Sequence, residues 1–149
     1  MQLTRAADYA VRVMIHLAGL PPSTRASRAE LAEAAECPEQ FLSKVLQSLT
    51  RAGLVISHRG NTGGFELPNI HRTASLLEVV EAIEGPIRLN VCLNSDRSCA
   101  RQAWCPAHDV WVSAQEAVAN VLRNASISVM AQQACARKKS KLVESPKWN

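Results

Sequence analysis

The sequence predicts a mainly α-helical protein with one small β-hairpin, built as a winged helix-turn-helix followed by a long C-terminal helix. Three observations predict this fold. Two short amphipathic segments flank Cys37 and Pro38 at the spacing of a helix-turn-helix. Two short segments of alternating character follow directly, separated by the glycine-rich turn 61–64, as the strands of a wing would be. A narrow apolar stripe then continues at helical spacing over residues 107–124.

This pattern divides the 149 residues into four parts. Residues 1–72 form the winged helix-turn-helix, whose first helix we also expect at a dimer interface. Residues 73–106 hold a connecting helix and a cysteine-containing loop, and residues 107–135 form the helix expected to dimerise. Residues 136–149 are a basic tail that we expect to be disordered. The length is sufficient for one domain with a core and a dimerisation arm.

Composition favours a polyanionic partner. The chain has 17 Lys and Arg against 13 Asp and Glu, a formal net charge of +4. Part of the excess is a cluster in the tail, formed by Arg137, Lys138, Lys139 and Lys141, which we interpret as a solvated end. No segment resembles a signal peptide, and no apolar run could span a bilayer. We therefore expect a cytoplasmic protein without a membrane partner, whose reduced cysteines favour a metal site over disulfides.

The first helix is expected to begin at Thr4, a suitable N-cap, and to end at the break over 19–23. Its apolar positions recur at helical spacing: Ala6, Ala10, Met14 and Leu17. Asp8 and Arg12 are four residues apart in the favourable order, which predicts an exposed ion pair.

Ser27 is expected to cap a second, short helix, with Glu30 at the capping-box position. Cys37 and Pro38 end it, and a third helix follows from Glu39 to Ala52, with Gly53 as its C-terminal glycine. In a helix-turn-helix the second of the two helices enters the DNA major groove. The outward residues of this predicted recognition helix are Gln40, Ser43, Lys44, Gln47 and Arg51. They include no acid, as a base-reading face requires, although an ordinary solvated face could have the same composition.

The hairpin after this helix predicts a wing. Arg59 at its tip is placed to enter the minor groove, with His58 and Asn61 beside it. The glycine pair could also belong to a plain hairpin turn, but the order helix, turn, helix, hairpin favours the wing. We also expect Thr4 and Arg5, at the start of the first helix, among the DNA contacts.

A capped amphipathic helix over 75–84 leads, through Gly85 and Pro86, into a loop that contains three of the five cysteines. The side chains that could bind a metal are Cys92, Cys99, Cys105 and His108. The residues between the first two cysteines are polar and aperiodic, so a metal could supply the ordering energy that packing does not. Because His108 lies three residues after Cys105, at the start of a helix with Pro106 in its first turn, the two side chains share a face.

Three cysteines and one histidine are a full ligand set for zinc or for an iron-sulfur cluster with one imidazole ligand. The tight Cys-x2-4-Cys knuckles of structural zinc sites are missing, which favours the cluster. The alternative is that the cysteines are ordinary half-buried residues and that His108 has no metal role. We interpret Cys37 and Cys135 as structural.

The long helix from Ala107 to Asn124 carries an apolar stripe formed by Trp111, Ala114, Val118, Val121 and Ala125. A second copy of the same helix is the simplest partner for it, although the helix could instead fold back on its own domain. Residues 126–135 are expected to add a short final helix.

This order of segments resembles the Rrf-two family of bacterial transcription regulators, the group that contains IscR, NsrR and RirA. The resemblance covers about residues 1–134. It is carried by QLTRAADYAVR, by FLSKVLQSLTRAGLV followed by RGNTGGFEL, and by the three loop cysteines with Trp111 after them. It implies a homodimer that binds double-stranded operator DNA and carries one iron-sulfur cluster (2Fe-2S or 4Fe-4S) per subunit, ligated by the three cysteines, whose presence, oxidation or loss changes DNA affinity.

Members of the family differ in the fourth ligand, and this chain matches two patterns. In the IscR-like pattern a histidine three residues after the last cysteine completes the site, and His108 matches it. In an NsrR-like pattern an aspartate of the first helix comes from the partner subunit, and Asp8 matches that. We favour His108, because it needs no partner chain and imidazole is the softer ligand.

The sequence therefore predicts a dimeric regulator in which the cluster sets the distance between the two recognition helices, and so senses nitric oxide, redox state or iron supply. A regulator of the same fold that uses zinc or a thiol switch is one alternative. An iron-sulfur carrier that does not bind DNA is another, and the wing counts against it. We expect no enzyme and no catalytic residue, since the chain has no Ser-His-Asp set, phosphate-binding glycine loop or nucleotide fingerprint.

Overall fold

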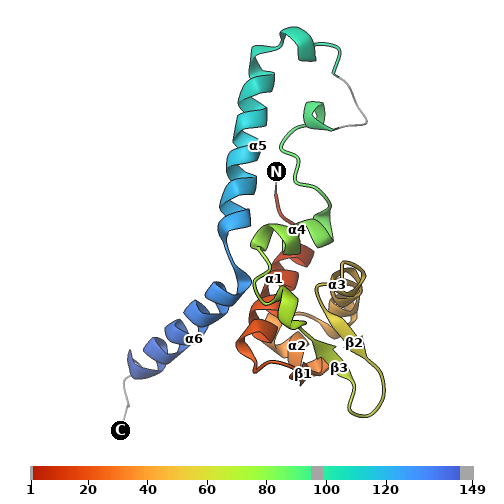
Figure 1. Ribbon diagram of the computed structural model, residues 1–149, viewed down its shortest axis with the longest axis vertical. Coiled ribbons are helices and arrows are strands. Elements are labelled where there is room, and N and C mark those ends of the chain that lie inside the picture. Colours follow the sequence, from red (N-terminus) through yellow and green to blue (C-terminus); the bar gives the residue numbers. More distant parts are fainter. Residues whose placement is uncertain (1, 95–98, 145–149) are drawn as a thin grey trace.

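The computed structural model describes residues 2–94 and 99–144 and has the predicted mainly α-helical fold (Figure 1). Its α-helices are α1 (Arg5–Gly19), α2 (Arg28–Ala35), α3 (Glu39–Arg51), α4 (Leu76–Glu84), α5 (Pro106–Asn124) and α6 (Ile127–Glu144). Its strands are β1 (Arg25–Ala26), β2 (Ile56–His58) and β3 (Gly64–Glu66). Short 3-10 turns are η1 (Asn69–His71), η2 (Val91–Leu93) and η3 (Gln102–Trp104). None of the helices described is long and apolar enough to cross a membrane.

The helix-turn-helix is confirmed, and α1 is the centre of its core. α1 packs against α2, α3, α4 and α6. Its side chains Val13, Met14 and Leu17 are almost fully buried, because they recur on one face at helical spacing. The apolar face of α3 closes the core from the other side with Leu42, Val45, Leu46 and Leu49. Burial of these two faces fixes the position of α3, so its opposite face is held at the surface.

Helix ends follow the predicted caps with one exception. Thr4, Ser27 and Ser75 each accept a hydrogen bond from a backbone N–H in the first turn of their helix. The capping box is complete only in α4, where the Glu78 carboxylate reaches back to Ser75. In α2 the prediction of a capping box was wrong. The Glu30 carboxylate lies 3.1 Å from His16 Nε2 instead, and so joins α2 to α1.

The sheet has a third strand that the sequence analysis missed. The order is β1-β3-β2, with both pairs antiparallel; Ser57 of β2 and Ala26 of β1 both face Phe65 of β3. β1 has only two residues, too few to show alternation. It approaches Gly64 so closely that a Cβ there would lie 2.7 Å from the Ala26 carbonyl oxygen. The base of the wing is therefore held on both sides.

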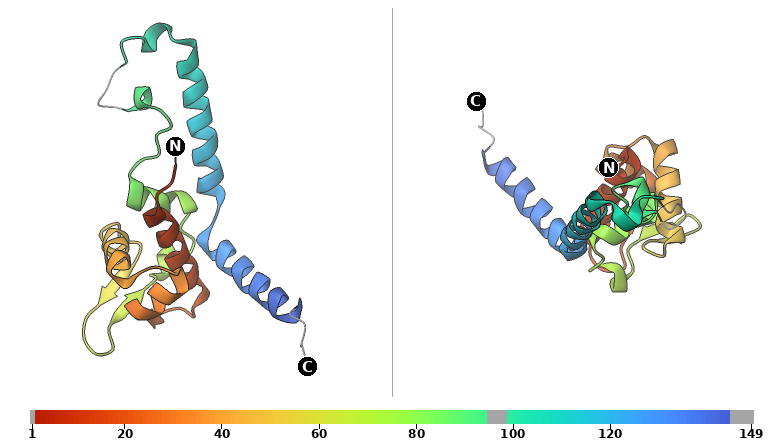
Figure 2. Two further views of the ribbon diagram at one scale, coloured as in Figure 1. Left: turned by 180° about the vertical axis from the view of Figure 1, so that it is seen from behind. Right: turned by 90° about the horizontal axis from the view of Figure 1, so that it is seen from above.

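The segment after α4 leaves the winged-helix domain, α5 runs back to it, and α6 starts at the domain and extends outward (Figures 1 and 2). The domain-proximal part of α5 packs on the domain, where Ala119 and Leu122 contact Leu77, Val80 and Ile87. At the bend, the Leu76 N–H donates to Ala125 and the Ile127 N–H to Ala74. Ile127 is completely buried. The start of α6 is therefore part of the domain core.

Helix α6 continues to Glu144, past residue 135 where the sequence analysis expected the final helix to end. The sequence analysis gave too much weight to the positive charge of residues 137–141. Alanine, lysine and arginine are strong helix formers, and an exposed helix tolerates their charge. Residues 145–149, the rest of the expected tail, lie outside the described residues.

Candidate DNA-contacting face and cysteine pocket

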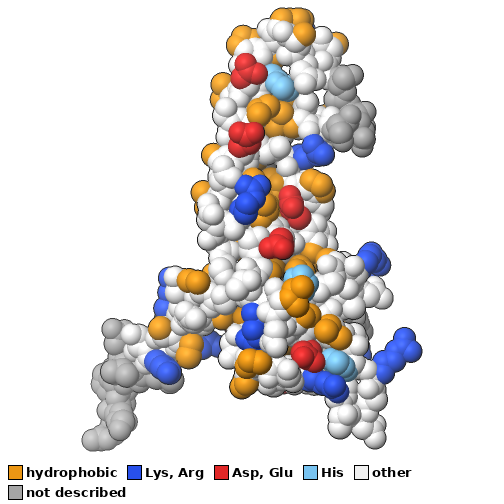
Figure 3. Space-filling view, viewed as in Figure 1, with side chains coloured by type: hydrophobic (Ala, Val, Ile, Leu, Met, Phe, Trp, Pro, Cys, Tyr) orange, Lys and Arg blue, Asp and Glu red, His pale blue; other side chains and the backbone are white. Residues whose placement is uncertain are grey.

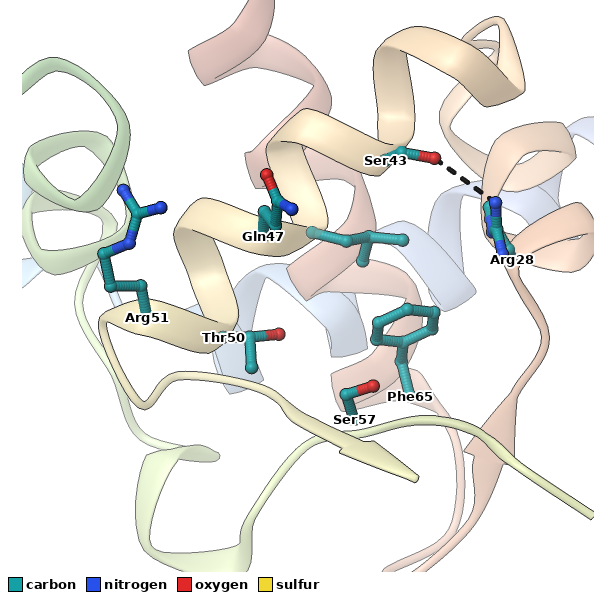
Figure 4. Close-up of a pocket in the computed structure, with 8 residues that line it drawn as sticks. Arg28, Ser43, Gln47, Thr50, Arg51, Ser57 and Phe65 are labelled. Carbon is teal, nitrogen blue, oxygen red and sulfur yellow. Dashed lines mark hydrogen bonds between the residues drawn. The ribbon is translucent and has the colours of Figure 1, made fainter. Parts of the chain in front are cut away.

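A hollow of about 480 Å³ lies between α3 and the wing (Figure 4). Its lining residues come from α2, α3, β2 and β3: Arg28, Ser43, Leu46, Gln47, Thr50, Arg51, Ser57 and Phe65. Two of the predicted base readers, Gln47 and Arg51, are exposed at its rim, and Gln40 and Lys44 are exposed on α3 outside it. Arg28, Thr50 and Ser57 were not predicted. They come from three elements, and only the tertiary fold brings them together.

Ser43, another predicted base reader, already has partners within the chain. Its hydroxyl donates to the Glu39 carbonyl at 3.0 Å, one helical turn earlier. The Arg28 guanidinium donates to the same hydroxyl oxygen at 3.4 Å (Figure 4). Because a serine hydroxyl has a single proton, Ser43 has no donor left for a base.

The predicted wing residues differ in their contacts. The His58 Nε2 lies 2.8 Å from a carboxylate oxygen of Glu66 on the neighbouring strand, and both side chains are largely buried. This pair joins β2 to β3 and holds the wing. Arg59 and Asn61 are exposed in the turn between the strands. The Arg25 guanidinium donates to the Thr62 carbonyl at 3.0 Å and so ties that turn to β1.

Thr4, also predicted to contact DNA, is bound to the end of α4. Its backbone N–H and its hydroxyl donate to one carboxylate oxygen of Glu84, at 3.0 Å and 2.5 Å. The same hydroxyl oxygen caps α1 by accepting from the Ala7 N–H at 3.4 Å. Arg5 beside it is exposed. The contact joins the start of α1 to the segment that leads into the cysteine loop.

The predicted metal ligands line one pocket of about 430 Å³ at the far end of α5. Its lining residues are Asn90, Val91, Cys92, Cys99, Gln102, Cys105, His108 and Trp111. Cys92 lies in η2, Cys105 is the N-cap of α5, and His108 is in the first turn of that helix, with Pro106 at its predicted position. The His108 N–H donates to the Cys105 carbonyl at 3.1 Å, which places both side chains on the same side.

The donor set of this pocket fits a soft metal centre: three free thiols and one imidazole. Cys92 and Cys105 are half-buried and Cys99 is exposed. Within residues 2–94 and 99–144, no three His, Cys, Asp or Glu side chains lie close enough to bind one metal ion. The pocket therefore collects the ligands without bringing them to bonding distance.

Asp8, the alternative fourth ligand, is not among the residues lining this pocket. Its carboxylate forms the predicted ion pair with Arg12, at 2.8 Å. The Arg12 guanidinium also donates to the Ala35 carbonyl at 3.1 Å, and so joins α1 to the end of α2. Asp8 would have to leave this pair to bind a metal.

The other two cysteines lie elsewhere. Cys37 is buried in the helix-turn-helix, and burial raises the pKa of its thiol while Arg12 lowers it less. This fits its interpretation as a structural residue. Cys135 is exposed on α6 and lines a hollow between α6 and α1.

The free surface of α5 is apolar over much of its length. None of its residues is buried, and Val110, Trp111 and Val121 are 63%, 41% and 71% exposed. Hydrophobic side chains lie at the surface along the column formed by this helix (Figure 3). An apolar face of this kind is typical of a surface that binds another protein chain.

Comparison with known proteins gives a matching family model and several relatives. A family model described as Rrf2, an iron-dependent transcriptional regulator, matches residues 3–133. Over 87 residues the chain is 39% identical to Rv1287 of Mycobacterium tuberculosis, described as an HTH-type transcriptional regulator. This match covers 58% of the chain and 54% of that protein, so the chain spans about half the length of this relative. Over 96 residues it is 38% identical to protein aau3 of Rhizobium meliloti, covering 64% of this chain and 61% of aau3.

Solved structures agree with the fold. CymR, the global cysteine regulator of B. subtilis, superimposes with a TM-score of 0.69 at 25% identity, covering 89% of this chain and 98% of CymR. T. potens IscR superimposes with a TM-score of 0.68 at 23% identity, covering 90% of this chain and 88% of IscR, and shows the shared fold alone. Since the family model covers most of the chain, the family predicted from the sequence is confirmed. The chain belongs to the Rrf2 family of transcriptional regulators.

Proposed function

We propose that this protein is a dimeric regulator that binds operator DNA through α3 and the wing, with an affinity controlled by an iron-sulfur cluster. The proposed ligands are Cys92, Cys99, Cys105 and His108. The observation that carries the proposal is that these four side chains line a single pocket. That pocket is connected to the DNA-binding domain by a short segment, residues 85–92.

The proposed DNA contacts are those predicted residues that are exposed and whose side chains form no hydrogen bond within residues 2–94 and 99–144: Arg5, Gln40, Lys44, Gln47, Arg51, Arg59 and Asn61. Thr4, Ser43 and His58, predicted as contacts, are assigned positioning roles because each is hydrogen-bonded within the chain. Arginine and lysine supply the phosphate contacts, and glutamine and asparagine can read base edges.

The second subunit is expected to cover the free face of α5. Three large apolar side chains on that helix are exposed in the single chain. A twofold dimer would bury them in both subunits, because the same patch of each subunit faces the other. The same dimer would place two copies of α3 at a fixed separation, which a palindromic operator requires.

Segment 85–92 supplies a physical route between the two sites. The Leu89 N–H donates to Gln115 of α5 at 3.1 Å, and Ile87 is buried between α4 and α5. Glu84, directly before the segment, holds Thr4 at the start of α1. A bound cluster would supply a redox-active iron centre whose loss the protein can sense. Drawing the cysteines together would move the segment, and through it α1 and α5.

Anaerobic purification tests this proposal. The wild type is expected to show visible absorbance with iron and acid-labile sulfide, and Cys99→Ala to lose all three. A duplex selected by the wild type from a random pool is then used to compare the operator affinity of the cluster-containing and cluster-free forms. Equal affinity of the two forms would contradict cluster control, and a protein without iron would contradict the cluster itself.

The fourth ligand is tested by comparing His108→Ala with Asp8→Ala. If His108 is a ligand, His108→Ala alone should change the visible spectrum, because Asp8 lies in an ion pair away from the pocket. The opposite result would assign the site to Asp8 of the partner subunit.

A second candidate is a regulator of the same kind that uses a thiol switch or zinc. The observation that favours it is that the described ligands do not converge at metal-binding distance. A colourless protein with zinc, or with a disulfide between pocket cysteines after mild oxidation, and a matching change in operator affinity, would support this candidate over the cluster.

A further inference from the structure

We infer that Arg28, on α2, anchors a phosphate of the operator backbone and that Ser43 of α3 positions it. The inference rests on the proposed binding of DNA by α3 and the wing. It adds a contact from outside the recognition helix and changes the role of Ser43 from base reader to support.

The first step concerns the path of the DNA. If α3 lies in the major groove and the wing reaches the minor groove, the sugar-phosphate strand between those grooves must cross the gap that separates α3 from β2 and β3. The hollow of about 480 Å³ lies in this gap. Arg28 and Arg51 lie at its two ends, and the hydroxyls of Thr50 and Ser57 lie between them (Figure 4). Cations and hydroxyls are the groups that bind phosphate oxygens.

The second step concerns the side chain of Arg28. It is exposed at the first position of α2, directly after the cap residue Ser27. The first helix of a helix-turn-helix crosses the DNA backbone, so a cation at its start is placed for a phosphate. One guanidinium N–H is used by Ser43, and the remaining donors can bind phosphate oxygens.

The third step concerns Ser43. Its proton goes to the Glu39 carbonyl, so its oxygen can only accept, and Arg28 is the donor that it accepts from. This contact limits the rotamers of a long side chain that would otherwise be mobile, and so reduces the entropy lost on binding DNA.

The test uses the selected duplex and measures the affinity of the wild type, Arg28→Ala and Arg28→Lys over a range of salt. Each phosphate contact adds about 0.9 to the slope of log affinity against log salt. The ratio of wild-type DNA affinity to Arg28→Ala DNA affinity should therefore fall by about 3.5-fold between about 50 and about 200 mM salt. Arg28→Lys should restore the slope, and Ser43→Ala should weaken binding while leaving the slope unchanged.

Arg137→Ala is the matched control, because it removes the same charge from an exposed position on α6. A wild-type slope in Arg28→Ala would overturn the inference, and so would equal loss of slope in Arg28→Ala and Arg137→Ala. Loss of affinity for a single base pair, rather than for every sequence, would also overturn it. If the wild type itself selects no duplex from the pool, the proposed function fails, and this outcome is distinct from the others.

Discussion

Replacing Gly64 by alanine should destabilise the wing far more than the same change at Gly60. Gly64 begins β3 with φ at +138°, and a Cβ there would lie 2.7 Å from the carbonyl oxygen of Ala26. Gly60 also has a positive φ, +99°, but a Cβ there would meet nothing within 4 Å. Both variants therefore place a Cβ at a positive φ, and Gly64→Ala adds the clash with β1.

The magnitudes follow from these two terms. A backbone conformation that residues with a Cβ rarely adopt costs about 1–3 kcal/mol, so Gly60→Ala should lower the free energy of unfolding by about that amount. Gly64→Ala adds a collision with backbone, which cannot rotate away, and overpacking of this kind costs about a further 1–3 kcal/mol. Strand β1 would have to separate from β3, which would also loosen the turn that Arg25 holds at Thr62.

Urea unfolding of both variants measures the two energies, and titration of the selected duplex measures their effect on DNA binding. Gly64→Ala should lose more stability and more affinity than Gly60→Ala. Equal losses in the two variants would refute the argument, because they would show that the approach of β1 to Gly64 does not constrain the wing.

Three further predictions concern the core, the cap of α4 and the dimer. Ile127→Ala should lower the free energy of unfolding by about 2–5 kcal/mol in denaturant titrations, because Ile127 is completely buried. Val129→Ala, at a half-exposed site on the same helix, should lower it far less. Similar losses in the two variants would show that α6 does not belong to the core. Hydrogen bonds from the Ser75 N–H and hydroxyl hold the pKa of Glu78 below its usual value. These bonds therefore stabilise the fold above the unfolded pKa of about 4.3, and their contribution is lost as pH falls through the folded pKa. Unfolding curves between about pH 3 and pH 7 should show a smaller acid-induced loss of stability in Glu78→Gln than in the wild type, and an unchanged pH profile would contradict the cap. Val121→Glu should shift the protein toward a monomer in sedimentation velocity, because Val121 is 71% exposed on the proposed interface. The circular dichroism spectrum should stay that of the wild type. An unchanged mass would place the interface elsewhere.

Helices and caps could be predicted from the sequence because their signals are local. Each signal lies within one or two helical turns of the residues that it controls. Examples are the apolar repeat of α1, the Ser75 cap of α4 and the break at Cys37 and Pro38. The two-residue strand β1 could not be predicted, since its existence depends on β3, about 40 residues later. The extent of α6 was misjudged because charge was taken as a sign of disorder although the same residues favour a helix.

The candidate sites show the same division. The cysteine loop was identified from spacing alone, and the pocket contains every residue predicted for it except the alternative ligand Asp8. The DNA face was predicted from one helix, so residues contributed by neighbouring elements, such as Arg28 and Ser57, were missed. The sequence pattern also cannot show that Ser43, Thr4 or His58 is already hydrogen-bonded within the chain.

The central claim is that the contents of the cysteine pocket control how tightly the protein holds DNA. The most direct measurement is the operator affinity of one anaerobic preparation before and after removal of its iron, with Cys99→Ala measured in parallel. The account predicts that the wild-type affinity changes on iron removal to the value of Cys99→Ala, which itself does not change. A wild-type affinity that is the same before and after iron removal would contradict it.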